Sequence, residues 1–85
     1  MIHKIIELKT HRYTLICTYK SGEIIEYDMS DIKHSQGIMA KPLKNPEYFA
    51  KVFLESGAPT WPNGYDVCPE AIYRTSRNIN YKKAS

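Results

Sequence analysis

Residues 61–70, with the sequence WPNGYDVCPE, organise the chain, because they place a large ring, a tight turn and a helix start in one uninterrupted run. Asn63-Gly64 predicts the turn, since both residue types accept a positive φ at little cost. Pro69 suits the first position of a helix, where its missing N–H would be unpaired anyway, and this makes Cys68 the predicted N-cap. The run therefore predicts that the last strand is joined to the last helix by a fixed corner.

We expect this corner to be structural, because nothing in it names a reaction. Trp61 brings apolar area that a small core needs, together with an indole N–H that requires a partner. Cysteine is a weaker cap than Ser or Asp, so we expect Asp66 to supply the negative charge that a helix N-terminus favours. The candidate structural residues of the corner are Trp61, Asn63, Gly64, Asp66 and Pro69.

Length and composition indicate one small domain. Its 85 residues lie near the lower size at which a single core stabilises a fold unaided. Seven tyrosines against two phenylalanines are typical of a half-buried sheet with polar rims. No apolar run approaches the ~20 residues of a membrane span, and residues 1–7 are too short and too charged for a signal peptide. We therefore expect no membrane partner, a cytoplasmic location and two reduced cysteines.

The net charge of +3 is unevenly distributed along the chain. Residues 71–85 contain no acid and carry a charge of +4, whereas the other seventy residues carry eight basic and nine acidic side chains. We predict a single α+β domain over residues 1–77 and a frayed basic tail over residues 78–85. The candidate basic patch is Arg74, Arg77, Lys82 and Lys83.

Three segments at the start of the chain alternate apolar and polar residues, as strands do. We predict strands over Ile2–Lys9, Tyr13–Tyr19 and Glu23–Met29. In the second of them, alternation places Cys17 on the face that also carries Leu15. We expect Cys17 to lie in the core.

The loop between the second and third strands decides their register. A two-residue loop at Ser21-Gly22 would place Cys17 opposite Glu26. A three-residue loop that also includes Lys20, with Gly22 in the left-handed conformation, instead opposes Leu15 to Tyr27, Cys17 to Ile25 and Tyr13 to Met29. We choose the three-residue loop because it keeps one face apolar throughout.

The middle of the chain is less regular. Ser30–Lys33 predicts one capped turn, and residues 34–41 are typical of a loop. Asn45-Pro46-Glu47 predicts a helix start with Asn45 as cap. Helical spacing allows one long helix to Ser56, whereas the β-branched and aromatic residues after position 50 favour a single turn followed by a strand over Lys51–Glu55.

In the second alternative, Ser56-Gly57 turns the chain back into a strand over Ala58–Trp61. Pro59 places this returning strand where at least one side is unpaired, because proline cannot donate to a ladder. A short helix from Pro69 would direct Ile72 and Tyr73 inward. The predicted fold is α+β, with a small antiparallel sheet of about five strands, one short helical turn in mid-chain and a short C-terminal helix.

Several motifs together resemble the bacterial family known as domain of unknown function 2442, over about residues 1 to 74. The motifs are Tyr-Thr-Leu followed by Lys-Ser-Gly, Tyr27-Asp28, Gly37 before Pro42-Leu43, Asn45-Pro46-Glu47-Tyr48-Phe49, and above all WPNGYDVCPEAIY. The residues at the family's signature positions are Phe49, Val52, Trp61, Gly64, Asp66, Pro69 and Tyr73.

The resemblance implies a small α+β domain and the short helix followed by a strand over residues 45–55. It implies no established activity. Some members are joined to a helix-turn-helix domain, or are encoded beside another small protein in an arrangement like that of a toxin–antitoxin pair. Relative to this pattern we expect no added DNA-binding domain, and the hairpin between Glu55 and Thr60 looks shorter than is usual in the family.

The residue types that catalysis or metal binding would need are scattered along the chain. His3, His11 and His34 lie far apart in the sequence, and metal ligands usually include two that are close, so we expect surface histidines and no metal. Capping and turn roles account for the acidic pairs Asp28/Asp31 and Asp66/Glu70. The four glycines are single, which excludes a phosphate-binding loop.

Cys68 is the sharpest enzymatic candidate, because a helix N-terminus favours a thiolate. No general base accompanies it, and Asp66 would oppose a negative charge there, so we interpret it as a small cap. We accordingly predict a protein that is not an enzyme and that has no cofactor.

Protein interaction is the class of function that remains after catalysis and metal binding are set aside. An open sheet in so short a chain has two edges, whose unpaired backbone groups can bind a partner strand or a second copy. The alternative is nucleic-acid binding or regulation through the basic C-terminal helix and tail, where rings alternate with cations. The residues of that alternative are Tyr73, Arg74, Arg77, Tyr81, Lys82 and Lys83.

Overall fold

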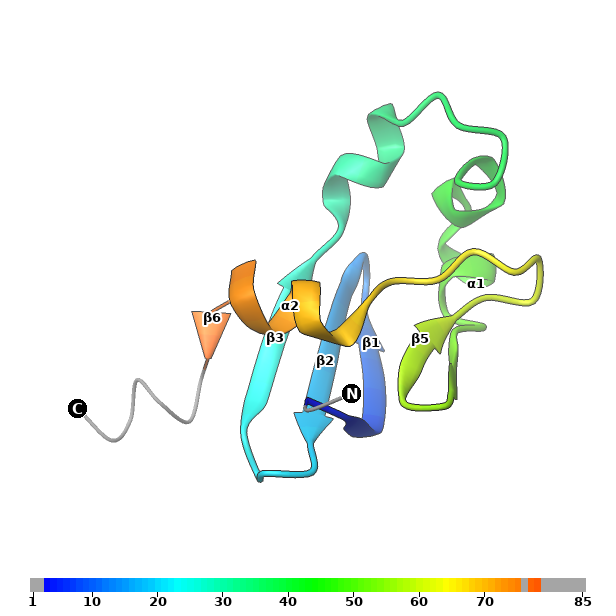
Figure 1. The fold of residues 1–85 in the computed structure, drawn as a ribbon. Coiled ribbons are helices and arrows are strands. Elements are labelled where there is room, and N and C mark those ends of the chain that lie inside the picture. The colour runs from blue at the N-terminus through cyan, green and yellow to red at the C-terminus, as the bar shows by residue number, and fades with distance from the viewer. Residues whose placement is uncertain (1–2, 76, 79–85) are drawn as a thin grey trace.

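A computed structural model describes residues 3–75 and 77–78, and Figure 1 shows their arrangement. Antiparallel strands build a main sheet in the order β1-β2-β3-β6 and a separate β4–β5 hairpin. The strands are β1 (Ile5–His11), β2 (Thr14–Tyr19), β3 (Ile24–Asp28), β4 (Phe53–Glu55), β5 (Ala58–Thr60) and β6 (Arg77–Asn78). The helical elements are the 3-10 turns η1 (Ser30–His34) and η2 (Lys41–Lys44), and the helices α1 (Pro46–Phe49) and α2 (Pro69–Thr75).

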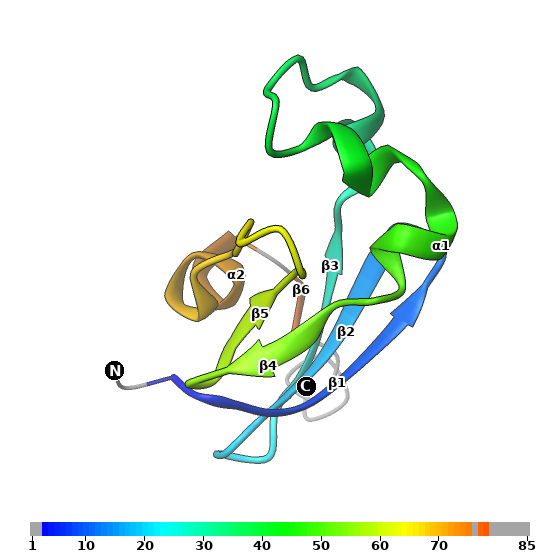
Figure 2. The same ribbon diagram turned by 90° about the vertical axis from the view of Figure 1, so that its right-hand side faces the viewer.

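This architecture confirms the predicted α+β class, with one helical turn in mid-chain and a short helix near the C-terminus. The strands are divided between two sheets, although β4 lies beside β1 (Figure 2). Asn78, the first residue of the predicted frayed tail, pairs with Ile25 of β3, and residues 79–85 lie outside the described residues.

The β2–β3 hairpin has the predicted register. Leu15 opposes Tyr27 and Cys17 opposes Ile25. Gly22 has a φ of 98°, and its N–H donates to the Tyr19 carbonyl at 2.8 Å. The three-residue loop is therefore correct, and the buried face of the hairpin is apolar.

The first strand differs from the prediction. It runs from Ile5 to His11, and its pairing with β2 shifts between Ile5 and Glu7, which makes Ile6 the extra residue of a β-bulge. Because of this bulge, Ile5 is buried at 1% exposure whereas Ile6 is 55% exposed.

The short-helix alternative for the middle of the chain is correct. Asn45 caps α1 through its Oδ1, which accepts from the Glu47 N–H at 2.8 Å, and the helix ends at Phe49. The 3-10 turn η2 was not predicted. It begins next to Pro42, whose fixed φ suits a helix start, and it buries Leu43 completely.

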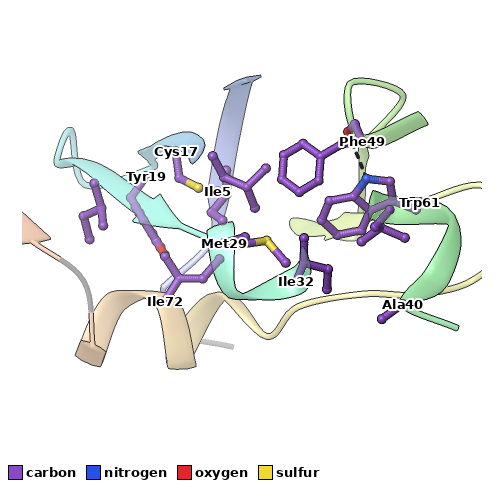
Figure 3. Packing of buried hydrophobic residues seen from close by; sticks show 12 residues of the cluster. Ile5, Cys17, Tyr19, Met29, Ile32, Ala40, Phe49, Trp61 and Ile72 are labelled. Atoms are coloured by element: carbon purple, nitrogen blue, oxygen red, sulfur yellow. Dashed lines mark hydrogen bonds between the residues drawn. The ribbon is translucent and has the colours of Figure 1, made fainter. Parts of the chain in front are cut away.

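One hydrophobic core holds these elements together (Figure 3). It lies on one face of β1–β3, and each of the four helical elements contributes an apolar side chain to it. The buried members are Ile5, Leu15, Cys17, Tyr19, Ile25, Met29, Ile32, Ala40, Leu43, Phe49, Trp61 and Ile72. No helix in the described part of the chain is long and apolar enough to cross a membrane.

Candidate functional site

Trp61 is fully buried at the centre of the corner. Its Nε1–H donates to the Phe49 carbonyl at 2.9 Å, as Figure 3 shows, and its ring lies 5.4 Å from that of Phe49 and 5.7 Å from that of Tyr65. The indole therefore has both the apolar surroundings and the hydrogen-bond partner that a buried tryptophan needs. This geometry is that of a scaffold residue.

The turn after Trp61 differs from the prediction in one respect. Gly64 has a φ of 94°, whereas Asn63 keeps a negative φ. The turn spans three residues, because the Trp61 N–H donates to the Tyr65 carbonyl and the Gly64 N–H donates to the Trp61 carbonyl, both at 2.8 Å.

Asn63 is held in the turn by hydrogen bonds of its side chain. Its Nδ2 donates to the Met39 carbonyl at 2.8 Å, and its Oδ1 accepts from the Tyr65 N–H at 3.1 Å. Asn63 thus joins the corner to a loop 24 residues earlier in the chain.

The corner then leads into α2. Asp66 forms a backbone bridge with Thr60, while its side chain is exposed. Pro69 is buried, and the Ile72 N–H donates to the Cys68 carbonyl at 3.2 Å, so the helix begins after Cys68. The Tyr19 hydroxyl donates to the Pro69 carbonyl at 2.9 Å, which ties this start to β2.

His3, near the N-terminus, contacts two side chains of α2, Glu70 and Tyr73, in a way that the sequence did not indicate. We call these contacts the clamp. The His3 backbone N–H and ring Nδ1 contact the Glu70 carboxylate at 2.8 and 2.9 Å. The His3 ring also stacks on Tyr73 at 3.7 Å, and the Tyr73 hydroxyl donates to Glu23. The hydrogen bonds from His3 lower the pKa of Glu70. His3 is therefore half-buried, and the prediction of an exposed histidine was wrong for it.

The two cysteines lie in different surroundings. Cys17 is fully buried, and burial raises the pKa of its thiol to about 12, which excludes it as a nucleophile near neutral pH. Its predicted place in the core is confirmed. Cys68 is exposed, and both cysteines are free. Residues 3–75 hold no group of three or more His, Cys, Asp and Glu side chains that could bind a metal ion.

Asp28 and Asp31 both line a pocket of about 250 Å³. Asp28 accepts from the Ser30 N–H at 2.8 Å, and this bond lowers the pKa of its carboxyl group. Sequence reasoning missed the pocket, because its walls come from β3, η1 and the corner. The lining residues are Tyr27, Asp28, Met29, Asp31, Ile32, Ser35 and Tyr65.

An exposed apolar loop lies near Gly64, the residue that precedes the pocket residue Tyr65. Ile38 is 88% exposed and Met39 is 47% exposed. The bond from Asn63 to the Met39 carbonyl and the proximity of Met39 Cε to Gly64 hold the loop beside Tyr65. We call the pocket together with residues 37–39 the pocket surface.

The predicted basic patch is only partly described. Arg74 is exposed in the last turn of α2, and Arg77 opposes Glu26 in the register of β6 and β3. Lys82 and Lys83 lie outside the described residues.

Comparison with known proteins identifies the family. The sequence pattern of the proteins of unknown function DUF2442 matches residues 5–78, which include the whole corner. The chain belongs to the DUF2442 family. No curated protein and no solved structure matches it. DUF2442 membership therefore agrees with the resemblance seen in the sequence and assigns no activity.

Proposed function

We propose that this DUF2442 protein is a non-catalytic protein-interaction module that binds its partner through the pocket surface. The observation that carries the proposal is the exposure of Ile38 and Met39 beside a pocket with two tyrosine rings. Large apolar side chains gathered on one surface and rimmed by polar groups mark interaction sites. Tyrosine and methionine are also enriched where proteins meet.

The sheet edges support interaction less well than this surface. β6 pairs with Ile25 and Glu26 along the edge of β3 that does not pair with β2, and β4 lies beside β1. Both neighbours reduce the length of free edge that a partner strand would need. We therefore place the interaction at the pocket surface.

The pocket indicates the chemistry of the partner. Asp28 and Asp31 supply two acidic residues to its lining, and Tyr27 and Tyr65 supply two aromatic ones. Aromatic rings and carboxylates together favour a cationic side chain. We propose that the bound segment carries one Lys or Arg beside an apolar residue that covers Ile38.

We further propose that the module acts in a bacterial cytoplasm, where its two free cysteines stay reduced. The first candidate partner is the product of a neighbouring gene, as the family resemblance implies.

Affinity capture from the native host tests this proposal. The wild-type chain is expected to retain a specific protein, and Ile38→Ser is expected to lose it. Ile6→Ser is the matched control, because Ile6 is also an exposed isoleucine but lies in β1, outside the pocket surface. Asp31→Asn should weaken the same complex.

Retention of nucleic acid alone would contradict the proposal. A salt series separates the two cases, since binding to phosphates weakens steeply as the salt concentration rises. Equal loss of the partner in Ile38→Ser and Ile6→Ser would also contradict the assignment of the surface.

A further inference from the structure

The outer face of β1–β3, opposite the core, carries side chains of which the proposed function uses only Asp28, at one end of the face. In β2 the side chains of Leu15, Cys17 and Tyr19 are buried, so alternation directs Ile16 to the other face. The four helical elements pack on the core side, and Figure 1 shows α2 crossing in front of β2 and β3. The outer face is therefore not used to build the core.

Charges on this face are ordered across the strands. The register places Lys9 of β1, Ile16 of β2 and Glu26 of β3 in one row. The next row repeats the order with His11, Thr14 and Asp28. In these two rows the basic side chains lie on β1 and the acidic ones on β3, with β2 between them.

The third row supplies the rest of the apolar area. It contains Glu7, Thr18 and Ile24. Thr18 and Ile24 are half-buried, as Ile16 is. An apolar centre with charges at its margins is the usual anatomy of a protein interface.

We propose that this outer face binds the same face of a second copy of the chain. A two-fold axis parallel to β2, lying between the two sheets, places Ile16 against the partner's Ile16. The same rotation exchanges the flanking strands, so Lys9 faces the partner's Glu26 and Glu26 faces the partner's Lys9. Facing sheets pack about 10 Å apart, a gap that a lysine and a glutamate can span together.

The Lys9 side chain can reach a carboxylate of the second copy. Lys9 Nζ lies 3.7 Å from Glu7 Oε2, and both side chains are more than half exposed, so the ammonium can contact a second carboxylate. Arg77 opposes Glu26 from β6 and falls beyond the partner's β1 in this arrangement. The face is complementary to itself, which an isologous dimer requires.

The contact is small, and the dimer is therefore weak. Three strands of about five residues cover roughly 14 by 17 Å at ordinary strand spacing, which is well below the area of a stable interface. We expect a rapid monomer–dimer equilibrium that shifts with protein concentration and weakens as salt screens the two charge pairs.

Sedimentation velocity over a concentration series up to about 1 mM tests the inference. The wild-type chain should dimerise, and Lys9→Glu or Glu26→Lys should raise the dissociation constant about tenfold or more, because each places like charges opposite one another. The double variant, with both substitutions, should restore the dimer.

Lys20→Glu is the matched control, because it makes the same charge change on an exposed residue of the β2–β3 loop and should leave the equilibrium unchanged. A monomer at every concentration, a double variant that fails to recover, or an equal effect of Lys20→Glu would overturn the inference. Partner capture depends on Ile38, which is not on the outer face, and should persist in Lys9→Glu, so the two proposals fail independently.

Discussion

At the residue scale, two side chains of the corner bond to backbone carbonyls that are distant in the sequence. Trp61 reaches the carbonyl of Phe49, and Asn63 reaches that of Met39. Each bond satisfies a polar group while fixing a segment that has little regular structure of its own. Single substitutions at these positions should therefore affect more than the local turn.

Trp61→Phe is expected to lower the free energy of unfolding by about 1–3 kcal/mol. The ring volume is mostly kept, but the Phe49 carbonyl loses its shorter hydrogen bond and keeps only the one from the Val52 N–H at 3.3 Å. Trp61→Ala also removes the ring and should cost about 3–5 kcal/mol. Urea denaturation measures both values, and equal costs for the two variants would contradict the role given to the indole N–H.

The two thiols should differ in reactivity in the native state. Cys68 is exposed and should be alkylated readily by iodoacetamide, whereas Cys17 is fully buried with a raised pKa and should react only after unfolding. Mass spectrometry of the labelled protein gives the site and the rate. Native labelling of Cys17 in a Cys68→Ser variant would show that the core of β2 is open.

At the element scale, local signals determined some segments and not others. The register of β2 and β3 was predictable, because only the three-residue loop leaves one face apolar. The bulge in β1 was not, since Ile5 and Ile6 are equally apolar and the choice between them depends on the packing opposite Tyr19. The corner carries strong turn and helix-start signals, whereas the clamp of His3 on Glu70 depends on segments 67 residues apart.

The β4–β5 turn should not tolerate a side chain at Gly57. Its φ is 83°, and an added Cβ would lie 2.7 Å from Lys4 Cγ. Gly57→Ala is expected to lower the midpoint of thermal unfolding. Gly37→Ala should leave it nearly unchanged, because the nearest atom to its added Cβ is Ser35 Oγ at 3.8 Å. Comparable shifts in the two variants would contradict this account of the turn.

The clamp on α2 should make stability depend on pH in the acid range. The folded-state pKa of Glu70 lies below its ordinary value of 4.5 because His3 donates to the carboxylate. Its contribution is therefore complete above the unfolded-state pKa and is lost as the pH falls through the folded-state pKa. Glu70→Gln should lose stability at pH 7 and converge on the wild type in acid.

Denaturant titrations at several pH values compare the two proteins, with Glu47→Gln as the control. Glu47 is an exposed acid in the first turn of α1, and its side chain has no part in the clamp. A constant difference between wild type and Glu70→Gln across the acid range would contradict the linkage.

At the scale of the whole molecule, the β1–β3 sheet is covered by the core and the helical elements on one face, and its other face takes no part in the core. The helical elements and the corner close the core face of β1–β3, and the outer face carries the ordered charges of the proposed dimer. The pocket surface lies at the junction of β3, η1 and the corner. The corner therefore serves the proposed function by holding the loop of Met39 and the ring of Tyr65 in place.

Fluorescence of the single tryptophan tests this central role of the corner most directly. If Trp61 is buried against Phe49 and Tyr65, its emission should lie at short wavelength in the native protein and should be quenched weakly by acrylamide until the chain unfolds. Emission at the wavelength of a solvated indole, with strong quenching in the native state, would contradict the account.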